Sequence, residues 1–339
     1  MKVAQLSDYQ QITIEDFPSP TIQVNEVLIQ SIYVGICGSE IHAYLGTHPF
    51  REPPSILGHE VLGKVIEIGD EVTKFNLGDL VTVEPHISCG ICSYCQSQKY
   101  NLCKEKVVLG TKGWSGAFAH YFTAPEQTVY KINANQEKEI HTLIEPLAVG
   151  VHAVNRVYLS KSSKVLVLGA GPIGILTAIA AIDQGVEQVV ITDTVDLNLE
   201  IAKQMTTLQT LNVTTEDISQ LIEKYVDGFD AIFVSVGVPA VIQQAIDLCK
   251  KDGAIITIAL YEKPILVNFN EIMLKEIKLL GSSMYVKKDI EKAIKIVEEN
   301  NYNLEKLITK RYDFADIKDA FEDNINNANE TIKTIIVFK

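Results

Sequence analysis

The stretch that decides the fold of this chain reads Val165-Leu166-Val167-Leu168-Gly169-Ala170-Gly171-Pro172-Ile173-Gly174. It begins with a short apolar run, which is typical of a buried parallel strand, and an Ala- and Ile-rich helix is expected after it. Glycines at this spacing allow a tight turn and let the backbone approach a pyrophosphate, which rests on the helix N-terminus. The next apolar strand, residues 189–192, ends on an acid placed to take ribose hydroxyls. The sequence therefore predicts dinucleotide binding by Gly169, Gly171, Pro172, Ile173, Gly174 and Asp193.

The chain around this stretch changes character on either side. Further apolar strands are expected at residues 231–236 and 254–260, with a helix-like segment at 239–249 between them. This alternation is typical of a doubly wound parallel sheet. The first third of the chain instead reads as many short strands separated by Gly and Pro turns, which indicates a β-barrel-like first domain. Amphipathic helices and a closing strand at residues 332–338 are expected at the end.

Potential metal ligands occur in one segment of the expected barrel domain, Cys37-Gly38-Ser39-Glu40-Ile41-His42, and again in Gly58-His59-Glu60. A thiolate, an imidazole and a carboxylate are the ligand types of an open, catalytic zinc site, in which one position is left for water or substrate. Ser39 and His42 stand beside the cysteine, where they could pass a proton on. On these residues alone, a buried Cys in a strand and a hydrogen-bonded core His remain the alternative.

Four of the six cysteines of the chain fall in one short window, as Cys89, Cys92, Cys95 and Cys103. Four thiolates from a Gly-rich, polar loop can close a tetrahedron around zinc and leave no open position. The alternative, four unrelated free thiols, does not account for this clustering. We therefore expect a structural zinc that holds a lobe at about residues 86–104, which lacks a core of its own.

The composition limits the classes of partner. The formal net charge is −13, and the acidic balance argues against nucleic acid or an anionic membrane as the main partner. Neither a signal peptide nor an uninterrupted apolar run long enough to span a bilayer is evident. We expect a cytoplasmic protein that acts on a small molecule. In that compartment, cysteines serve as metal ligands or catalytic groups more often than as disulfides.

With these residues in hand, the chain resembles the medium-chain, zinc-dependent alcohol dehydrogenase family along its whole length. The most specific match is Gly58-His59-Glu60-x-x-Gly63, and it coincides with the four-cysteine lobe and the nucleotide fingerprint in the order of the family. The resemblance implies an α/β protein of two domains. A GroES-like β-barrel catalytic domain would take residues 1–146 and 287–339, and a Rossmann domain with a doubly wound parallel sheet would take residues 147–286.

The resemblance also implies roles for single residues. Cys37, His59, Glu60 and Glu145 match the positions around the catalytic zinc, where Glu60 either ligates the metal or exchanges with water. Alcohol dehydrogenases of the family often carry Cys at the position of Glu145, so this residue points to the polyol, threonine and butanediol branch. Ser39 and His42 match the proton relay. Glu40, which stands where an Asp is usual, would orient the ligand His59.

The implied function is hydride transfer from a secondary alcohol, such as the polyol sorbitol, to NAD in an enzyme with two zinc ions per chain. Threonine 3-dehydrogenase and 2,3-butanediol dehydrogenase are the alternatives, and whether the substrate is phosphorylated stays open. A non-catalytic, nucleotide-sensing protein of the same fold is the alternative from another class. Loss of Cys37, His59 or Ser39 would indicate it, and all of them are present. The family also suggests a homo-dimer or homo-tetramer.

Overall fold

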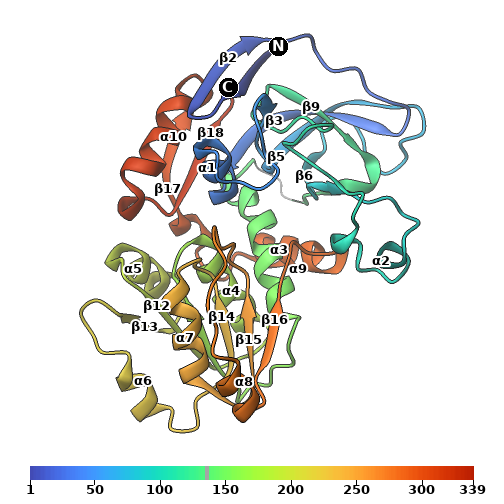
Figure 1. The fold of residues 1–339 in the computed structure, drawn as a ribbon. Coiled ribbons are helices and arrows are strands. Elements are labelled where there is room, and N and C mark those ends of the chain that lie inside the picture. The colour runs from blue at the N-terminus through green and yellow to red at the C-terminus, as the bar shows by residue number, and fades with distance from the viewer. Residues whose placement is uncertain (134–136) are drawn as a thin grey trace. The chain divides into compact units, whose positions relative to one another are not determined.

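The computed structural model describes residues 1–133 and 137–339 (Figure 1). The chain divides into two units, each with its own core. The first unit comprises Met1–Glu145, Val297–Glu299 and Leu307–Lys339, and the second comprises Pro146–Ile296 and Asn300–Lys306. Most of the helix that begins at Lys287 therefore belongs to the second unit. The expected domain boundaries stay a prediction.

The first unit is built on a seven-stranded sheet with the order β10-β6-β5-β3-β18-β17, to which β9 adds by pairing with β3. A smaller sheet has the order β2-β1-β4, and β7 pairs with β8. The strands are β1 (Lys2–Asp8), β2 (Gln11–Asp16), β3 (Glu26–Ile36), β4 (Ser55–Ile56), β5 (Glu60–Ile68), β6 (Leu80–Val83), β7 (His86–Ile87), β8 (Val107–Val108), β9 (Tyr121–Pro125), β10 (Val129–Lys131), β17 (Ile308–Asp313) and β18 (Lys333–Val337). The helices are α1 (Gly38–Leu45), α2 (Ser93–Gln96) and α10 (Ile317–Asn326).

The core of the first unit joins segments from both ends of the chain. β18 lies between β3 and β17, so a late strand completes a sheet that early strands begin. On α10, Phe321 is fully buried, with its ring 5.9 Å from that of Phe118 and 5.6 Å from that of Tyr44 on α1. Burial of large aromatic side chains contributes strongly to a core of this kind. The closing segment is therefore part of the first core.

The second unit contains a six-stranded sheet of parallel strands in the order β13-β12-β11-β14-β15-β16, which confirms the predicted doubly wound fold. The strand order reverses between β11 and β14, the point at which open α/β sheets bind ligands. The strands are β11 (Lys164–Leu168), β12 (Gln188–Asp193), β13 (Gln209–Asn212), β14 (Phe229–Val234), β15 (Cys249–Thr257) and β16 (Lys278–Gly281).

The second unit contains most of the remaining helices. They are α3 (Ile144–Val154), α4 (Pro172–Asp183), α5 (Asp196–Met205), α6 (Ser219–Lys224), α7 (Pro239–Leu248), α8 (Phe269–Lys275) and α9 (Lys287–Glu299). α4 begins with Pro172 at its first turn, where a missing N–H costs nothing. None of the helices in the described ranges has the length and apolar content needed to cross a membrane.

The glycine-rich turn between β11 and α4 is shaped by contacts that exclude a larger side chain at two positions. Gly169 has a φ of +102°, which side chains rarely allow. A Cβ on Gly174 would lie 1.9 Å from the Gly169 carbonyl oxygen and 2.8 Å from Ser235 Oγ. A Cβ on Gly171 would have no neighbour within 4 Å. The last glycine thus permits close packing of helix on strand, while the middle one leaves open space beside the turn.

This difference predicts that the same substitution destabilises the protein at Gly174 but not at Gly171. Gly174→Ala should destabilise the cofactor-free protein by about 1–3 kcal/mol, because backbone at the turn must move to admit the methyl group. Gly171→Ala is the control and should unfold close to the wild type. Urea unfolding followed by circular dichroism measures both free energies. Equal unfolding midpoints in the two variants would contradict the packing role of Gly174.

Candidate functional site

The predicted metal ligands of the first unit converge where β3 ends and β5 begins. β3 and β5 are antiparallel with Gly35 opposite Glu60, so Cys37, just beyond β3, comes near His59. The ligand atoms of Cys37, His59 and Glu60 all lie within 4.8 Å of one another. His59 is 6% exposed and Glu60 fully buried. We call these three residues the metal group.

Glu40 organises the metal group from the first turn of α1. Its Oε1 accepts a hydrogen bond from Gly58 N at 2.6 Å and lies 2.9 Å from His59 Nδ1. Its Oε2 accepts from Cys37 N at 2.9 Å. With Nδ1 engaged by a carboxylate, His59 presents Nε2 as the ligand nitrogen. The side chain of Glu40, which is longer than the usual Asp, therefore makes the contact with His59 that its predicted orienting role requires.

The contact between Glu40 and His59 shifts the pKa of both side chains towards their charged forms, and a metal bound at Nε2 would take the place of the proton there. Burial opposes ionisation of Glu40, but the charge and hydrogen bond of His59 outweigh it and keep the pKa of Glu40 below its usual value. Burial likewise disfavours charge on His59, yet the Glu40 carboxylate raises the pKa of His59 well above its usual value. A carboxylate that accepts a hydrogen bond from Nδ1 also makes the imidazole more basic, and therefore a stronger metal ligand.

Lys333 is the partner of Glu60 that sequence reasoning missed. Its Nζ donates to both Glu60 oxygens at 2.8 and 2.7 Å and to the Ile36 carbonyl at 3.2 Å. Burial opposes charge on Lys333, but Glu60 outweighs it and raises the pKa of the Lys333 ammonium. Gly35 makes room for the pair, since a Cβ there would lie 2.2 Å from Glu60 Oε2. The available signal was that Lys333 is the one charged residue of the closing strand at 332–338.

The predicted proton-relay residues differ in their surroundings. Ser39 Oγ is buried and has no hydrogen-bond partner within the described part of the chain. A buried hydroxyl in that state is costly unless a ligand supplies the partner. His42 is exposed, and its Nδ1 lies 2.9 Å from Thr47 Oγ1, a contact that no motif predicted. The Ser39 hydroxyl can therefore hydrogen-bond a ligand, and the His42 imidazole is accessible to solvent.

Glu145 lies in the first turn of α3 and is 7% exposed. The metal group, as the structure assembles it from described residues, consists of Cys37, His59 and Glu60 without Glu145. Buried carboxylates are rare unless they are paired or bind a metal. That Glu145 is the last ligand of the metal therefore stays a prediction.

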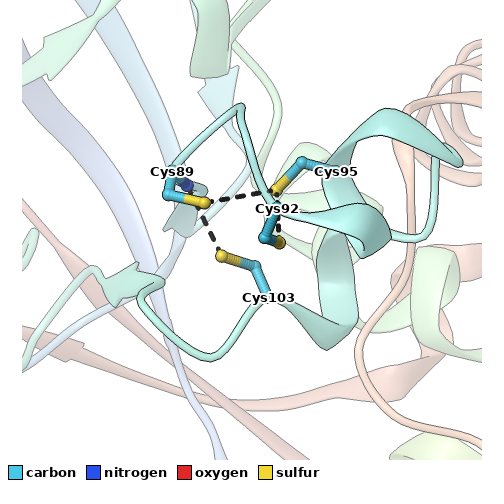
Figure 2. A group of neighbouring side chains, drawn as sticks. All are labelled: Cys89, Cys92, Cys95 and Cys103. Carbon is cyan, nitrogen blue, oxygen red and sulfur yellow. Dashed lines mark hydrogen bonds between the residues drawn. The ribbon is translucent and has the colours of Figure 1, made fainter.

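The four clustered cysteines converge as predicted (Figure 2). Their sulfurs lie within 4.8 Å of one another, with Cys89 Sγ 3.8 Å and Cys92 Sγ 3.5 Å from Cys95 Sγ. Tetrahedral zinc with Zn–S bonds of about 2.3 Å places sulfurs about 3.8 Å apart. Backbone N–H groups of Ile91 and Cys92 lower the pKa of the Cys89 thiol to about 6, whereas burial and a contact with Cys92 raise the pKa of the Cys95 thiol to about 11. The residues therefore fit a closed four-sulfur zinc site.

The predicted cofactor residues of the second unit are gathered at the carboxyl ends of β11 and β12. Asp193, the last residue of β12, accepts a hydrogen bond from Ala170 N at 2.5 Å through Oδ2. Its Oδ1 accepts from Thr194 N at 2.7 Å and Val195 N at 2.9 Å. A carboxylate offers about four acceptor sites, so about one remains for a ribose hydroxyl. Asp193 thus both shapes the glycine turn and keeps capacity for a ligand.

Comparisons with known proteins match this architecture. Residues 23–134 match the family described as "Alcohol dehydrogenase GroES-like domain", and residues 172–299 match "Zinc-binding dehydrogenase". The chain is 33% identical to sorbitol dehydrogenase of Bacillus subtilis, with 99% of this chain and 97% of that protein covered.

Two solved structures from Escherichia coli are similar over nearly the whole chain. One is an oxidoreductase/dehydrogenase of unknown specificity (TM-score 0.95, 31% identity, 100% and 99% coverage). The other is an alcohol dehydrogenase complexed with the cofactor NADH (TM-score 0.92, 26% identity, 100% and 99% coverage).

The chain belongs to the medium-chain, zinc-dependent alcohol dehydrogenase family. It is therefore an oxidoreductase that uses zinc and a nicotinamide cofactor. The predicted combination of a GroES-like domain with a Rossmann domain is confirmed.

The Lys333–Glu60 pair predicts a stability difference between single and double variants. Lys333→Met should destabilise the protein by about 3–5 kcal/mol, because it leaves a buried carboxylate without its charge partner. The double variant Lys333→Met/Glu60→Met removes both charges and should recover most of that loss. Chemical unfolding of metal-free protein measures both. If the single and double variants unfold at the same midpoint, charge compensation is not what Lys333 supplies.

The four-sulfur geometry predicts that Cys95→Ser lowers the zinc content of the purified protein and its melting temperature, because metal binding in such a lobe is coupled to folding. Cys249→Ala is the matched control, since Cys249 lies in the second core, where burial raises the pKa of its thiol to about 12. That variant should keep its full zinc content. Elemental analysis and thermal unfolding test this, and unchanged zinc content in Cys95→Ser would overturn it.

Proposed function

We propose that this protein is an NAD-dependent polyol dehydrogenase that oxidises a secondary alcohol group of a polyol such as sorbitol. The observation that carries the proposal is the convergence of Cys37, His59 and Glu60 within 4.8 Å in the first unit. A mixed sulfur, nitrogen and oxygen donor set is that of a catalytic zinc, whereas four sulfurs indicate a structural one. The similarity to sorbitol dehydrogenase of Bacillus subtilis supports a polyol as the substrate class.

The donor set fits a catalytic zinc held by Cys37 and His59, with Glu60 and Glu145 as the candidate oxygen ligands. When bound, the metal acts as a Lewis acid that lowers the pKa of the substrate hydroxyl. Lys333 engages both oxygens of Glu60, but a carboxylate offers about four acceptor sites, so an oxygen of Glu60 can still bind the metal. The Lys333 ammonium lowers the negative charge that Glu60 offers to the metal. Glu145 in place of a second sulfur makes the site richer in oxygen, which is compatible with a vicinal diol.

The proton of the substrate hydroxyl would leave through Ser39, the cofactor ribose and His42. Ser39 Oγ is buried and lacks a partner within the described residues, so a substrate hydroxyl would satisfy it. His42 is exposed, held at Nδ1 by Thr47, and can exchange a proton with solvent. Removing the proton in the oxidation direction leaves an electron-rich oxygen, which favours departure of hydride from the carbon that bears this oxygen.

The cofactor proposed is NAD, bound by Gly169, Gly171, Pro172, Ile173, Gly174 and Asp193. The open space at Gly171 lets a pyrophosphate approach the turn and the N-terminus of α4. Asp193 keeps an acceptor for a ribose hydroxyl and would repel a 2′-phosphate. We further propose a second, structural zinc at the four cysteines and a homo-oligomeric enzyme.

The substrate class is tested by steady-state reduction of NAD with sorbitol, other sugar alcohols, butanediols and threonine. Sugar alcohols should give the highest kcat/KM. A higher value for threonine or 2,3-butanediol would move the assignment to that branch. No turnover of any alcohol by zinc-loaded protein that binds NADH would favour the non-catalytic, nucleotide-sensing alternative.

Two histidine variants test the roles within the site. His59→Ala should abolish turnover and lose metal, yet still bind NADH, because the nucleotide residues belong to the second unit. His42→Ala should keep its metal and lose about a hundredfold or less in kcat with a changed pH profile, because water partly replaces a relay. Turnover, NADH titration and zinc analysis are measured on both. Comparable turnover by His59→Ala would show that the metal group is not the active site.

A further inference from the structure

The ends of three adjacent strands in the second unit are tied together by side chains. β11, β12 and β13 are neighbours in the sheet, so the turns that follow them lie side by side. Asp193 at the end of β12 holds the turn after β11 through Ala170 N. Asn212 at the end of β13 holds the turn after β12: its Nδ2 donates to Asp196 Oδ1 at 2.5 Å and to Thr194 O at 3.5 Å.

Asn212 is a buried residue with a fixed orientation. It is 5% exposed, and its Oδ1 accepts from Thr214 N at 2.9 Å and Thr214 Oγ1 at 2.7 Å. Because the carbonyl side of the amide accepts from Thr214, the NH₂ side must face the neighbouring turn. The amide therefore has one orientation, and it directs both of its donor contacts to the segment that follows Asp193.

Asp196 is an exposed carboxylate in the first turn of α5. The N-terminus of a helix attracts anions, so this end of α5 would by itself favour a phosphate. A carboxylate in the first turn offsets the positive end of the helix dipole and repels a phosphate that approaches it. With Asp193 three residues earlier, the turn carries two fixed negative charges and, from Thr194 to Asn198, no cation that could receive a phosphate.

We infer that Asp196, positioned by Asn212, is a second determinant of cofactor choice that excludes a 2′-phosphate on the adenosine ribose. This rests on the proposed function in that it takes the nicotinamide cofactor to bind at Asp193. Asp196 supplies the charge, and Asn212 is a positioning residue that keeps this charge and the Asp193 turn in place. Without the Asn212 contact, the Asp196 carboxylate would not be held at one place beside the Asp193 turn.

Three variants separate charge from position. Asp196→Asn keeps an oxygen that can accept from Asn212 but removes the charge. Asn212→Ala keeps the charge and removes its support, and Asp196→Ala removes both. The measurement is the dissociation constant of NADH and of NADPH for the zinc-loaded enzyme, followed by nicotinamide fluorescence, with kcat and KM for NAD and NADP alongside.

Asp196→Asn should bind NADPH about tenfold more tightly than the wild type and bind NADH within about twofold of it, because only the phosphate meets the missing charge. Asn212→Ala should weaken NADH binding about fivefold and shift selectivity towards NADPH. Its kcat at saturating NAD should stay within about twofold, since the turn faces the adenosine end of the cofactor rather than the reacting ring. Asp196→Ala should combine both effects.

Asn155→Ala is the matched control for a purely structural role. Asn155 makes the same kind of contact in the same unit, with Nδ2 donating to Asp289 Oδ1 at 2.8 Å. It should lower the melting temperature and leave the NADPH-to-NADH ratio of dissociation constants unchanged. If Asn212→Ala behaves like Asn155→Ala, Asn212 has only a structural role. If Asn212→Ala does not fold, Asp196→Asn alone decides, because it keeps the hydrogen bond.

The wild-type measurement separates this inference from the proposed function. Preference of the wild type for NADPH would overturn the NAD assignment itself. Preference for NADH, with an unchanged NADPH-to-NADH ratio in Asp196→Asn, would overturn only the role of Asp196. A gain in NADPH binding by Asp196→Asn with stability equal to the wild type supports the inference.

Discussion

The antiparallel pairing of β3 with β5 is the contact on which the candidate site depends. It sets Gly35 opposite Glu60, so that Cys37 and His59 meet at the end of the paired strands. A shift of this register by one residue would turn every side chain of β5 to the other face of the sheet. The absence of a side chain on Gly35 is part of the same constraint, because the space beside it holds the Glu60 carboxylate.

The carboxylates of the two units have different kinds of hydrogen-bond partner. In the first unit, the buried Glu40 and Glu60 carboxylates each have a side-chain partner, His59 and Lys333, and these pairs hold the metal group in shape. In the second unit, Asp193 accepts hydrogen bonds from backbone N–H groups beside the glycine turn and forms no ion pair with another described residue.

Local patterns predicted most of what the structure shows. The doubly wound sheet follows from the spacing of Gly169 to Gly174, because a strand, a tight turn and a helix leave few other arrangements. The convergence of the four cysteines follows from their close spacing in the chain. Lys333 could not be predicted in the same way, since it meets Glu60 across 273 residues and no local rule relates them. The contacts of Thr47 and Asn212 were not predicted for another reason. Side chains that orient other side chains belong to no sequence motif.

The position of β18 also bears on how the protein is made. β18 fills the place between β3 and β17, and both Lys333 and the strand that carries it are synthesised long after Glu60. Until then, the part of β3 from Tyr33 to Ile36 lacks the strand that pairs with it, and Glu60 lacks its ammonium partner. Contacts between such distant segments form slowly and leave the nascent chain open to misassembly. The ribosome therefore synthesises the second unit before the last strand of the first sheet is available.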